Sequence, residues 1–267
     1  MRRTIIVTTA LAALLIAGVA SATTPYTGPT INKYTASLTV SPKAAGSASA
    51  PSPVSFLEKL TAKNANSALN AGPLTDIDLK IYGLVSNYKD FKTCSFAKIL
   101  AAANDSGCPK GALVAQGPIN TILGQKTLSP SGSFACNPRL DVWNAGGGKV
   151  VEFFVTTLTP GSKYYCDGVK TGSAPPYVAT IKQSGKYLIQ NTPLPPSVST
   201  NVIGSLYGSL VLENLTWLKT TVKVNGKPVP YIASVACKAS KRPWSVTFTA
   251  TNGIGSQSET VSGADKC

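Results

Sequence analysis

Two short motifs contain residue types that could carry out acyl transfer. Ser95 and Lys98 form an S-x-x-K motif, and a K-T-G tripeptide begins at Lys170. A lysine one helical turn after a serine can help to activate the serine hydroxyl, which then attacks an acyl group. A serine acyl-enzyme that uses Ser95 and Lys98 is therefore one chemical interpretation of this sequence.

The context of these motifs argues against that interpretation. Penicillin-binding proteins and class A β-lactamases combine both motifs with an S-D-N element and a large helical domain. No S-D-N-like element lies between the motifs here, and the 72 positions from Lys98 to Lys170 leave too little chain for such a domain. Ser95 also adjoins Cys94, and Lys98 is expected to face solvent. We therefore expect a protein that is not an enzyme, and acyl transfer stays a remote alternative.

The sequence contains no histidine, which excludes several kinds of site. A Ser-His-Asp triad, a Cys-His dyad and a histidine-ligated zinc or copper site all need an imidazole. The six cysteines are expected to pair, which would leave no thiolate for catalysis or for zinc. We expect no metal, no cofactor and no catalytic residue.

Asp76 and Asp78 are the nearest acidic pair that could do chemistry. Two carboxylates can serve as acid and base in a glycosidase, or as calcium ligands. Residues two apart on a strand point to the same surface, whereas a glycosidase pair must flank a bond. A solvated strand face beside Lys80 is therefore the favoured interpretation.

Aromatic side chains offer the other possible binding surface. Exposed rings of Trp143, Tyr164, Tyr165 and Trp217 could stack on sugar rings, and these four residues are the candidate ligand-binding residues. Aromatic residues on strands are more often buried, because large rings gain most from burial. Their exposure decides between the two interpretations.

The N-terminus has the pattern of an export signal. Arg2 and Arg3 precede a mostly apolar run at 4–19, and small residues at 20–22 suit a cleavage site. We therefore expect a signal peptide over residues 1–22, followed by one exported domain over residues 23–267. The apolar run is too short for a comfortable membrane span, and no second long apolar stretch follows it. We expect a secreted or cell-envelope protein without stable membrane insertion.

The charge of the exported part suggests its partners. Removing the two arginines of the signal lowers the net charge from +14 to +12. A lysine-rich basic surface attracts anionic polymers without specific recognition. An anionic cell-wall polymer or a polysaccharide is therefore the expected class of partner, although the charge is also explained by solubility alone. Nucleic acid is not expected, since only two arginines remain and its recognition depends largely on arginine.

Six cysteines in an exported chain imply three disulfides, and sequence alone allows 15 connectivities. Locality in the sequence favours three pairs: Cys94–Cys108, Cys136–Cys166 and Cys237–Cys267.

Most of the chain has strand-like alternation. The clearest strand, residues 34–41, alternates apolar and hydroxyl side chains without a fault. Residues 54–64 are ambiguous between a strand and a helix that begins with a capping box. The best helical pattern places Phe96, Ile99, Leu100 and Ala103 on one face, between Cys94 and Cys108. Further strands are expected at 75–85, 112–123, 140–155, 177–181, 186–190, 210–217, 220–224 and 244–251.

This pattern predicts an all-β fold: an antiparallel β-sandwich with one short helix held by a disulfide. Short strands separated by Gly, Pro and Asn turns are typical of such folds.

Two segments resemble a poorly characterised family of exported actinobacterial proteins. One is the helix after Cys94 with the following Cys108-Pro109. The other is Cys237, Trp244, Phe248 and Cys267 around a Ser/Thr-rich hairpin. The resemblance implies a secreted, disulfide-bonded β domain and brings no active site with it. The additional pair Cys136 and Cys166 departs from the family pattern.

The sequence therefore predicts a non-enzymatic protein of the envelope or the extracellular space with a structural or interaction role. A carbohydrate- or cell-wall-binding module is the alternative. The sequence gives neither the ligand nor the oligomeric state.

Overall fold

The computed structural model describes residues 30–157, 159–167, 174–204 and 206–267. The expected signal peptide and the K-T-G tripeptide lie outside these residues. The main strands are β1 (Asn32–Ser41), β3 (Ser55–Asn64), β4 (Leu74–Tyr82), β6 (Leu113–Gly124), β7 (Phe134–Cys136), β8 (Arg139–Gly146), β9 (Lys149–Val155), β10 (Tyr177–Ser184), β11 (Tyr187–Pro193), β12 (Tyr207–Trp217), β16 (Lys241–Thr251) and β17 (Ser256–Lys266).

Smaller elements cover one end of the sheet and its outer face. They are β2 (Ser52–Pro53), β5 (Leu84–Ser86), β13 (Thr221–Val224), β14 (Lys227–Pro230), β15 (Ile232–Ser234), helix α1 (Phe96–Ala102) and two 3-10 turns, η1 (Tyr88–Asp90) and η2 (Lys110–Ala112).

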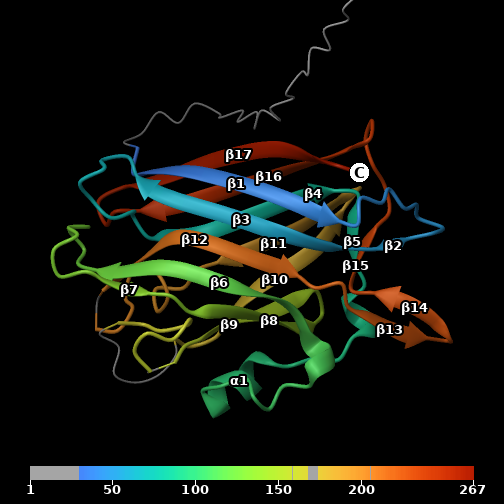
Figure 1. The fold of residues 1–267 in the computed structure, drawn as a ribbon, viewed down its shortest axis with the longest axis horizontal. Helices are drawn as coiled ribbons and strands as arrows, with labels where there is room; N and C mark the ends of the chain where they lie inside the picture. Colours follow the sequence, from blue (N-terminus) through green and yellow to red (C-terminus); the bar gives the residue numbers. More distant parts are fainter. Residues whose placement is uncertain (1–29, 158, 168–173, 205) are drawn as a thin grey trace, which may run out of the picture.

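One continuous antiparallel sheet contains all the main strands. Its order is β1-β3-β12-β6-β8-β9-β10-β11-β4-β16-β17, and β7 pairs with β6. The sheet curls until β1 and β17 lie beside each other, so it is barrel-like and nearly closed (Figure 1). The all-β antiparallel prediction is confirmed. The predicted β-sandwich differs from the structure in one respect: eleven strands, from β1 at one edge to β17 at the other, follow a single hydrogen-bonded path and are not divided between two facing sheets.

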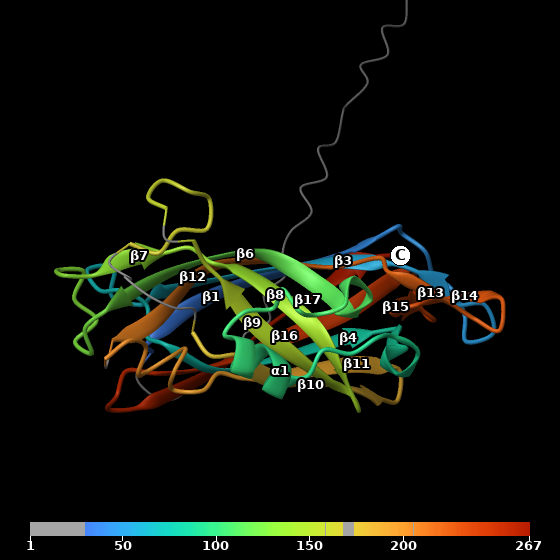
Figure 2. The ribbon, with the colours of Figure 1, turned by 90° about the horizontal axis from the view of Figure 1, so that it is seen from below.

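The barrel-like sheet is flattened, which explains the resemblance to a sandwich. Figure 2 shows β1, β3, β12 and β6 along one wall, with β4, β10 and β11 along the opposite wall. Strict alternation along β1 buries Tyr34, Ala36, Leu38 and Val40. The ring of Tyr34 stacks on Phe248 of β16 at a centroid distance of 4.4 Å. The sequence pattern identified such inward faces correctly, although it does not tell which strands lie opposite them.

Side chains close the seam between β1 and β17. The buried Gln257 accepts hydrogen bonds from the backbone N–H groups of Ile31 and Asn32, both at 2.7 Å, and donates to the Asn32 carbonyl at 2.9 Å. At the other end, Asp265 accepts from the Val40 N–H at 2.7 Å and pairs with Lys43 at 2.6 Å. Two side chains of β17 therefore satisfy backbone groups of β1 that lack a strand partner.

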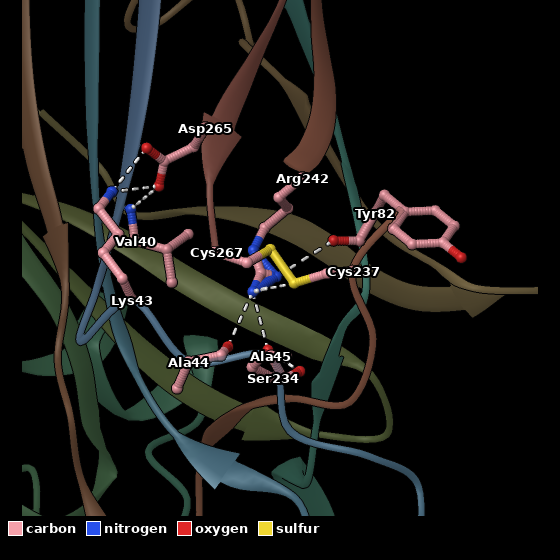
Figure 3. The surroundings of a disulfide bond; sticks show 10 residues. All are labelled: Val40, Lys43, Ala44, Ala45, Tyr82, Ser234, Cys237, Arg242, Asp265 and Cys267. Carbon is pink, nitrogen blue, oxygen red and sulfur yellow. Dashed lines mark hydrogen bonds and ion pairs between the residues drawn. A yellow bond between two sulfur atoms is a disulfide. The ribbon is translucent and has the colours of Figure 1, made fainter. Parts of the chain in front are cut away.

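The last disulfide, Cys237–Cys267, lies beside a buried guanidinium at this seam (Figure 3). Arg242 donates to the carbonyl of Ala44 at 3.2 Å and to the hydroxyl of Ser234 at 2.8 Å. Burial lowers the pKa of Arg242. The guanidinium therefore ties the chain after β1 to β15 through neutral acceptors.

Helix α1 lies outside the sheet and is shorter than its sequence pattern. The Ser95 hydroxyl accepts from the Lys98 N–H at 3.2 Å and caps the first turn, and the helix ends at Ala103 in a left-handed conformation. Ile99 is buried against the sheet, whereas Phe96 and Leu100 are 37% and 47% exposed. Only part of the predicted apolar face of the helix is therefore buried.

All three predicted disulfides are confirmed: Cys94–Cys108, Cys136–Cys166 and Cys237–Cys267. No cysteine among the described residues is free. Three disulfides indicate an oxidising, extracellular environment. Within the part of the chain that the structure describes, no helix is long and apolar enough to cross a membrane.

The seam gives a first prediction. Replacing Gln257 with alanine removes four hydrogen bonds, one of them to Glu259, and leaves two backbone N–H groups at the seam without a protein partner. The free energy of unfolding should fall by about 3 kcal/mol, because each buried donor without a partner costs roughly 1–3 kcal/mol. Urea unfolding followed by tryptophan fluorescence measures this. Gln183→Ala is the matched control, since Gln183 is exposed. A Gln257→Ala variant as stable as that control would contradict the role of the seam.

Candidate functional site

The acyl-transfer motif lies on the surface. Ser95 and Lys98 are both exposed, and the Ser95 hydroxyl caps helix α1. Neither residue lines the cavities described below. The structure gives Ser95 a role in helix capping.

Asp76 and Asp78 lie on the outer face of β4. The Asn191 amide of β11 donates to Asp76 at 3.0 Å and to Asp78 at 2.8 Å. Partial burial and the charge of Asp78 raise the pKa of Asp76. A neutral amide thus links the two carboxylates across neighbouring strands on a surface that faces solvent.

The four candidate aromatic residues do not form one exposed row. Trp217 and Trp143 are 1% and 7% exposed, so neither offers a ring face to a sugar. The Trp143 indole N–H instead donates to Asp105 at 3.1 Å. Tyr164 and Tyr165 are half-buried in the loop after β9, and the Arg139 guanidinium lies 5.6 Å from the Tyr164 ring centroid.

The interior of the sheet contains three acidic residues that the sequence analysis did not select. Glu58 of β3, Glu152 of β9 and Glu213 of β12 are 2%, 2% and 8% exposed. All three line one internal cavity of about 60 Å³. Buried carboxyl groups are uncommon unless they are paired with a cation or well hydrogen-bonded.

Strand periodicity places these carboxyl groups inside. In β3, Glu58 occupies the inward position between Phe56 and Leu60. In β9, Glu152 lies between the inward residues Val150 and Phe154, while Val151 and Phe153 pack under helix α1. These alternations were a usable signal, but a glutamate within such a pattern suggests an outward face.

A bulge explains the third glutamate. The register of β12 against β6 shifts between Leu210 and Leu212. Leu210, Glu213 and Leu215 all line the cavity, so the shift brings Glu213 to the same inward face as Leu210 although the two are three residues apart. Alternation read from the start of the strand cannot locate such a shift.

The three carboxyl groups have different surroundings. The Glu152 carboxyl accepts hydrogen bonds from the side chains of Gln190 and Thr192 of β11, both at 3.4 Å. In the strand ladder, Glu152 lies opposite Tyr177 of β10. Glu58 lies opposite Leu215, and its Oε2 atom has no hydrogen-bond partner among the described residues. The described chain contains two ion pairs, Lys43–Asp265 and Arg139–Asp141, so no lysine or arginine side chain in it pairs with the interior carboxyls.

Burial favours the neutral form of each carboxyl. Burial, and then the charge of Glu152, raise the pKa of Glu58 to about 8; the nearby Trp217 indole partly offsets this rise. Burial raises the pKa of Glu152 to about 7, against hydrogen bonds from Tyr177, Thr192 and Gln190 that lower it. Burial and the charges of Glu58 and Glu152 hold the pKa of Glu213 well above its ordinary value. Glu58 and Glu213 therefore retain protons near neutral pH, whereas Glu152 ionises close to it.

A larger pocket adjoins the acidic cavity. Its volume is about 310 Å³, and the two spaces share Thr121, Phe154, Val198 and Gly208 as lining residues. The Cys136–Cys166 disulfide forms part of its wall, and Ile203, which is 55% exposed, marks its outer side. Most of the remaining wall is apolar: Leu123, Pro138, Ala174, Pro175 and Val202.

The opposite end of the interior is filled by aromatic rings. Trp217 stacks on Phe56 at a centroid distance of 5.3 Å and on Tyr231 at 6.5 Å. Phe91 meets the Tyr231 ring edge-on at 5.1 Å. These packed rings fill that part of the interior, whereas the larger pocket shares four lining residues with the acidic cavity. Among the described residues, no group of three or more acidic, cysteine or histidine side chains could hold a metal ion.

Comparison with family models, with curated proteins and with solved structures found no match for this chain. The resemblance to exported actinobacterial proteins stays a sequence-based expectation. The function is therefore inferred from the geometry of the interior.

The buried glutamates predict an unusual dependence of stability on pH. The folded protein keeps protons that the unfolded chain releases above the ordinary glutamate pKa of 4.5. The free energy of unfolding should therefore be highest below that pH, fall as pH rises through the raised pKa values of Glu152 and Glu58, and keep falling until Glu213 has also ionised. We expect a fall of a few kcal/mol between about pH 5 and about pH 8.5, measured by urea unfolding.

Variants separate the interior acids from the rest of the protein. A Glu58→Gln, Glu213→Gln double variant should lose most of this pH dependence, because an amide does not titrate. Asp90→Asn removes an exposed carboxylate and should leave the dependence unchanged. Stability that stays constant or rises with pH in the native sequence would refute the neutral state of the interior carboxyls.

Proposed function

We propose that this chain is an exported, non-enzymatic binding protein that holds a small, largely apolar molecule inside its barrel-like sheet. One observation carries the proposal: an apolar pocket of about 310 Å³ adjoins a cavity that is lined by three buried glutamates. Small-molecule sites are typically concave, mostly apolar and supplied with a few convergent polar groups. The packed aromatic rings would close the site at its far end.

The geometry favours binding over catalysis. The acidic cavity, at about 60 Å³, has room for a few water-sized groups and none for a sugar ring beside a water nucleophile. A glycosidase needs its carboxyls on both sides of a bound substrate bond. A ligand whose body stays in the apolar pocket and whose polar end reaches the glutamates fits both volumes.

Filling the larger pocket tests this proposal. Ser197 lines the pocket, whereas Thr200 belongs to the same turn and is not part of the lining. The neutral fluorescent probe N-phenyl-1-naphthylamine should bind the native protein saturably, with a rise in fluorescence. Ser197→Trp should weaken this binding at least about tenfold, or about 1.4 kcal/mol.

Thr200→Trp adds the same bulk outside the pocket and should bind the probe as the native protein does. Circular dichroism checks that both variants are folded. Absence of saturable binding, or equal binding by Ser197→Trp and Thr200→Trp, would overturn the proposal.

A second proposal concerns the outer surface. We propose that the protein also associates electrostatically with anionic cell-wall polymer. The exported part carries +12, and three of its eleven acidic residues lie in the interior, so the outside is more basic than the sum suggests. Such attraction is screened by salt.

Co-sedimentation with purified cell wall tests the second proposal. Binding is expected at low salt and should disappear at high salt, because surface charge supplies it. Binding that persists at high salt would instead favour specific carbohydrate recognition, and absence of binding at low salt would refute association.

A further inference from the structure

The acidic side chains inside the sheet have no basic side chain as an ion-pair partner among the described residues. The basic residues of the described chain lie outside it except for Arg242, which is 1% exposed and binds neutral acceptors at the seam. The carboxyls of Glu58, Glu152 and Glu213 therefore share one enclosed space with no counter-cation from the described residues. Several apolar side chains separate them from water: Leu74, Ile77, Leu79, Ile119, Leu140 and Leu215.

The fold itself does not require these acids. Buried charged or polar groups without full partners usually cost stability relative to apolar residues of similar size. The Oε2 atom of Glu58, in a residue that is 2% exposed, has no partner and belongs to the lining of the cavity. An acceptor left in this state is ready for a donor that arrives with a ligand.

Shape and charge together restrict that ligand. The apolar walls of the larger pocket suit a hydrocarbon or aromatic body. The small adjoining cavity suits a compact polar end group, and its carboxylates favour a cation with several N–H donors. A carboxylate or phosphate would be repelled by any ionised glutamate, and a neutral carboxyl offers it one O–H donor and no opposite charge.

We propose that the pocket binds a primary amine with an apolar body, and that Glu58, Glu152 and Glu213 receive its ammonium group. This inference rests on the proposed function of the pocket. Each N–H of the ammonium donates to a carboxylate oxygen, and Glu58 Oε2 gains the partner that it lacks. The interior then holds a charge pair in place of isolated acids.

The groups around the ammonium determine how many protons are released when the amine binds. The titratable groups that face the ammonium are Glu58 of β3, Glu152 of β9, Glu213 of β12 and Tyr177 of β10; β11 contributes the uncharged Gln190 and Thr192. The remaining lining from β4, β6 and β8 is apolar apart from Thr121. An entering ammonium ion favours the ionised form of the carboxyls around it, so those that are still protonated, Glu58 and Glu213 above all, release protons to solvent. Amine binding therefore releases protons and strengthens as pH rises from about 6 to about 8.

Three probes with the same tail test the inference by calorimetry: n-octylamine, n-octanol and n-octanoate. At about pH 8, octylamine should bind at least about tenfold more tightly than octanol. Octanoate should bind weakest, even though the protein is strongly basic. Titrations in buffers of different ionisation enthalpy should detect proton release with octylamine and none with octanol.

Glu58→Gln keeps the shape of the side chain and removes its charge. This variant should reduce the preference for amine over alcohol by about tenfold, while octanol binding changes little. Glu152→Gln gives the same test should Glu58→Gln fail to fold. Asp90→Asn, on the surface, should keep the native preference.

The outcomes separate this inference from the proposed function. Equal binding of octylamine and octanol, tighter binding of octanoate, or a full amine preference in Glu58→Gln would overturn the amine and leave a neutral or anionic ligand for the pocket. Binding of N-phenyl-1-naphthylamine without binding of any octyl probe would also overturn the amine. Failure of all four probes would refute both the amine and the pocket.

Discussion

Every strand of a sheet must satisfy its backbone groups, and the two outermost strands here obtain part of that satisfaction from side chains. Gln257 and Asp265 of β17 bind N–H groups near the two ends of β1. Regular ladder hydrogen bonds do not join these strands, so the seam depends on a few groups placed in register. The Cys237–Cys267 disulfide and the buried Arg242 hold the end of the seam at which β17 finishes (Figure 3). An exposed strand edge invites pairing with other chains, and this closure covers it.

Closure also creates the chemistry of the interior. Once the sheet curls on itself, the inward glutamates lose water, and desolvation dominates their protonation. In an open sheet, the same residues would be ordinary surface acids. The position of each acid follows from strand alternation, but its function follows from enclosure. One architectural feature thus links the edges of the sheet to the ligand proposed for its centre.

Sequence patterns predicted local features well. The alternation of β1, the helix after Cys94 and the three short-range disulfides all depend on neighbours in the chain, and the structure contains each of them. The single curled sheet was not predictable in this way, because β12 inserts between β3 and β6, which lie far from it in the sequence. Alternation shows that one face is buried and does not identify the strand that lies opposite.

The candidate site was missed for related reasons. Glu58 left residues 54–64 ambiguous between a capped helix and a strand, and the structure places this glutamate at a regular inward position of a strand. Glu213 depends on a bulge that only the paired strand reveals. Trp217 was considered for a sugar-binding surface, but its ring fills the blind end of the interior. The sequence signal for burial was present in each case, and the polar or aromatic character of the residue suggested exposure instead.

The seam also affects the order of events in folding. Ribosomes make a chain from its N-terminus, so β1 exists long before β17, its neighbour across the seam. Until β17 is made, the seam cannot form and the edge of β1 stays open. Closure of the sheet is therefore a late event, and it takes place wherever the last strand first meets the rest of the protein. A ligand present at that place and moment would encounter an open cleft rather than a finished pocket, so the surroundings in which folding ends would help to select the molecule that the protein carries.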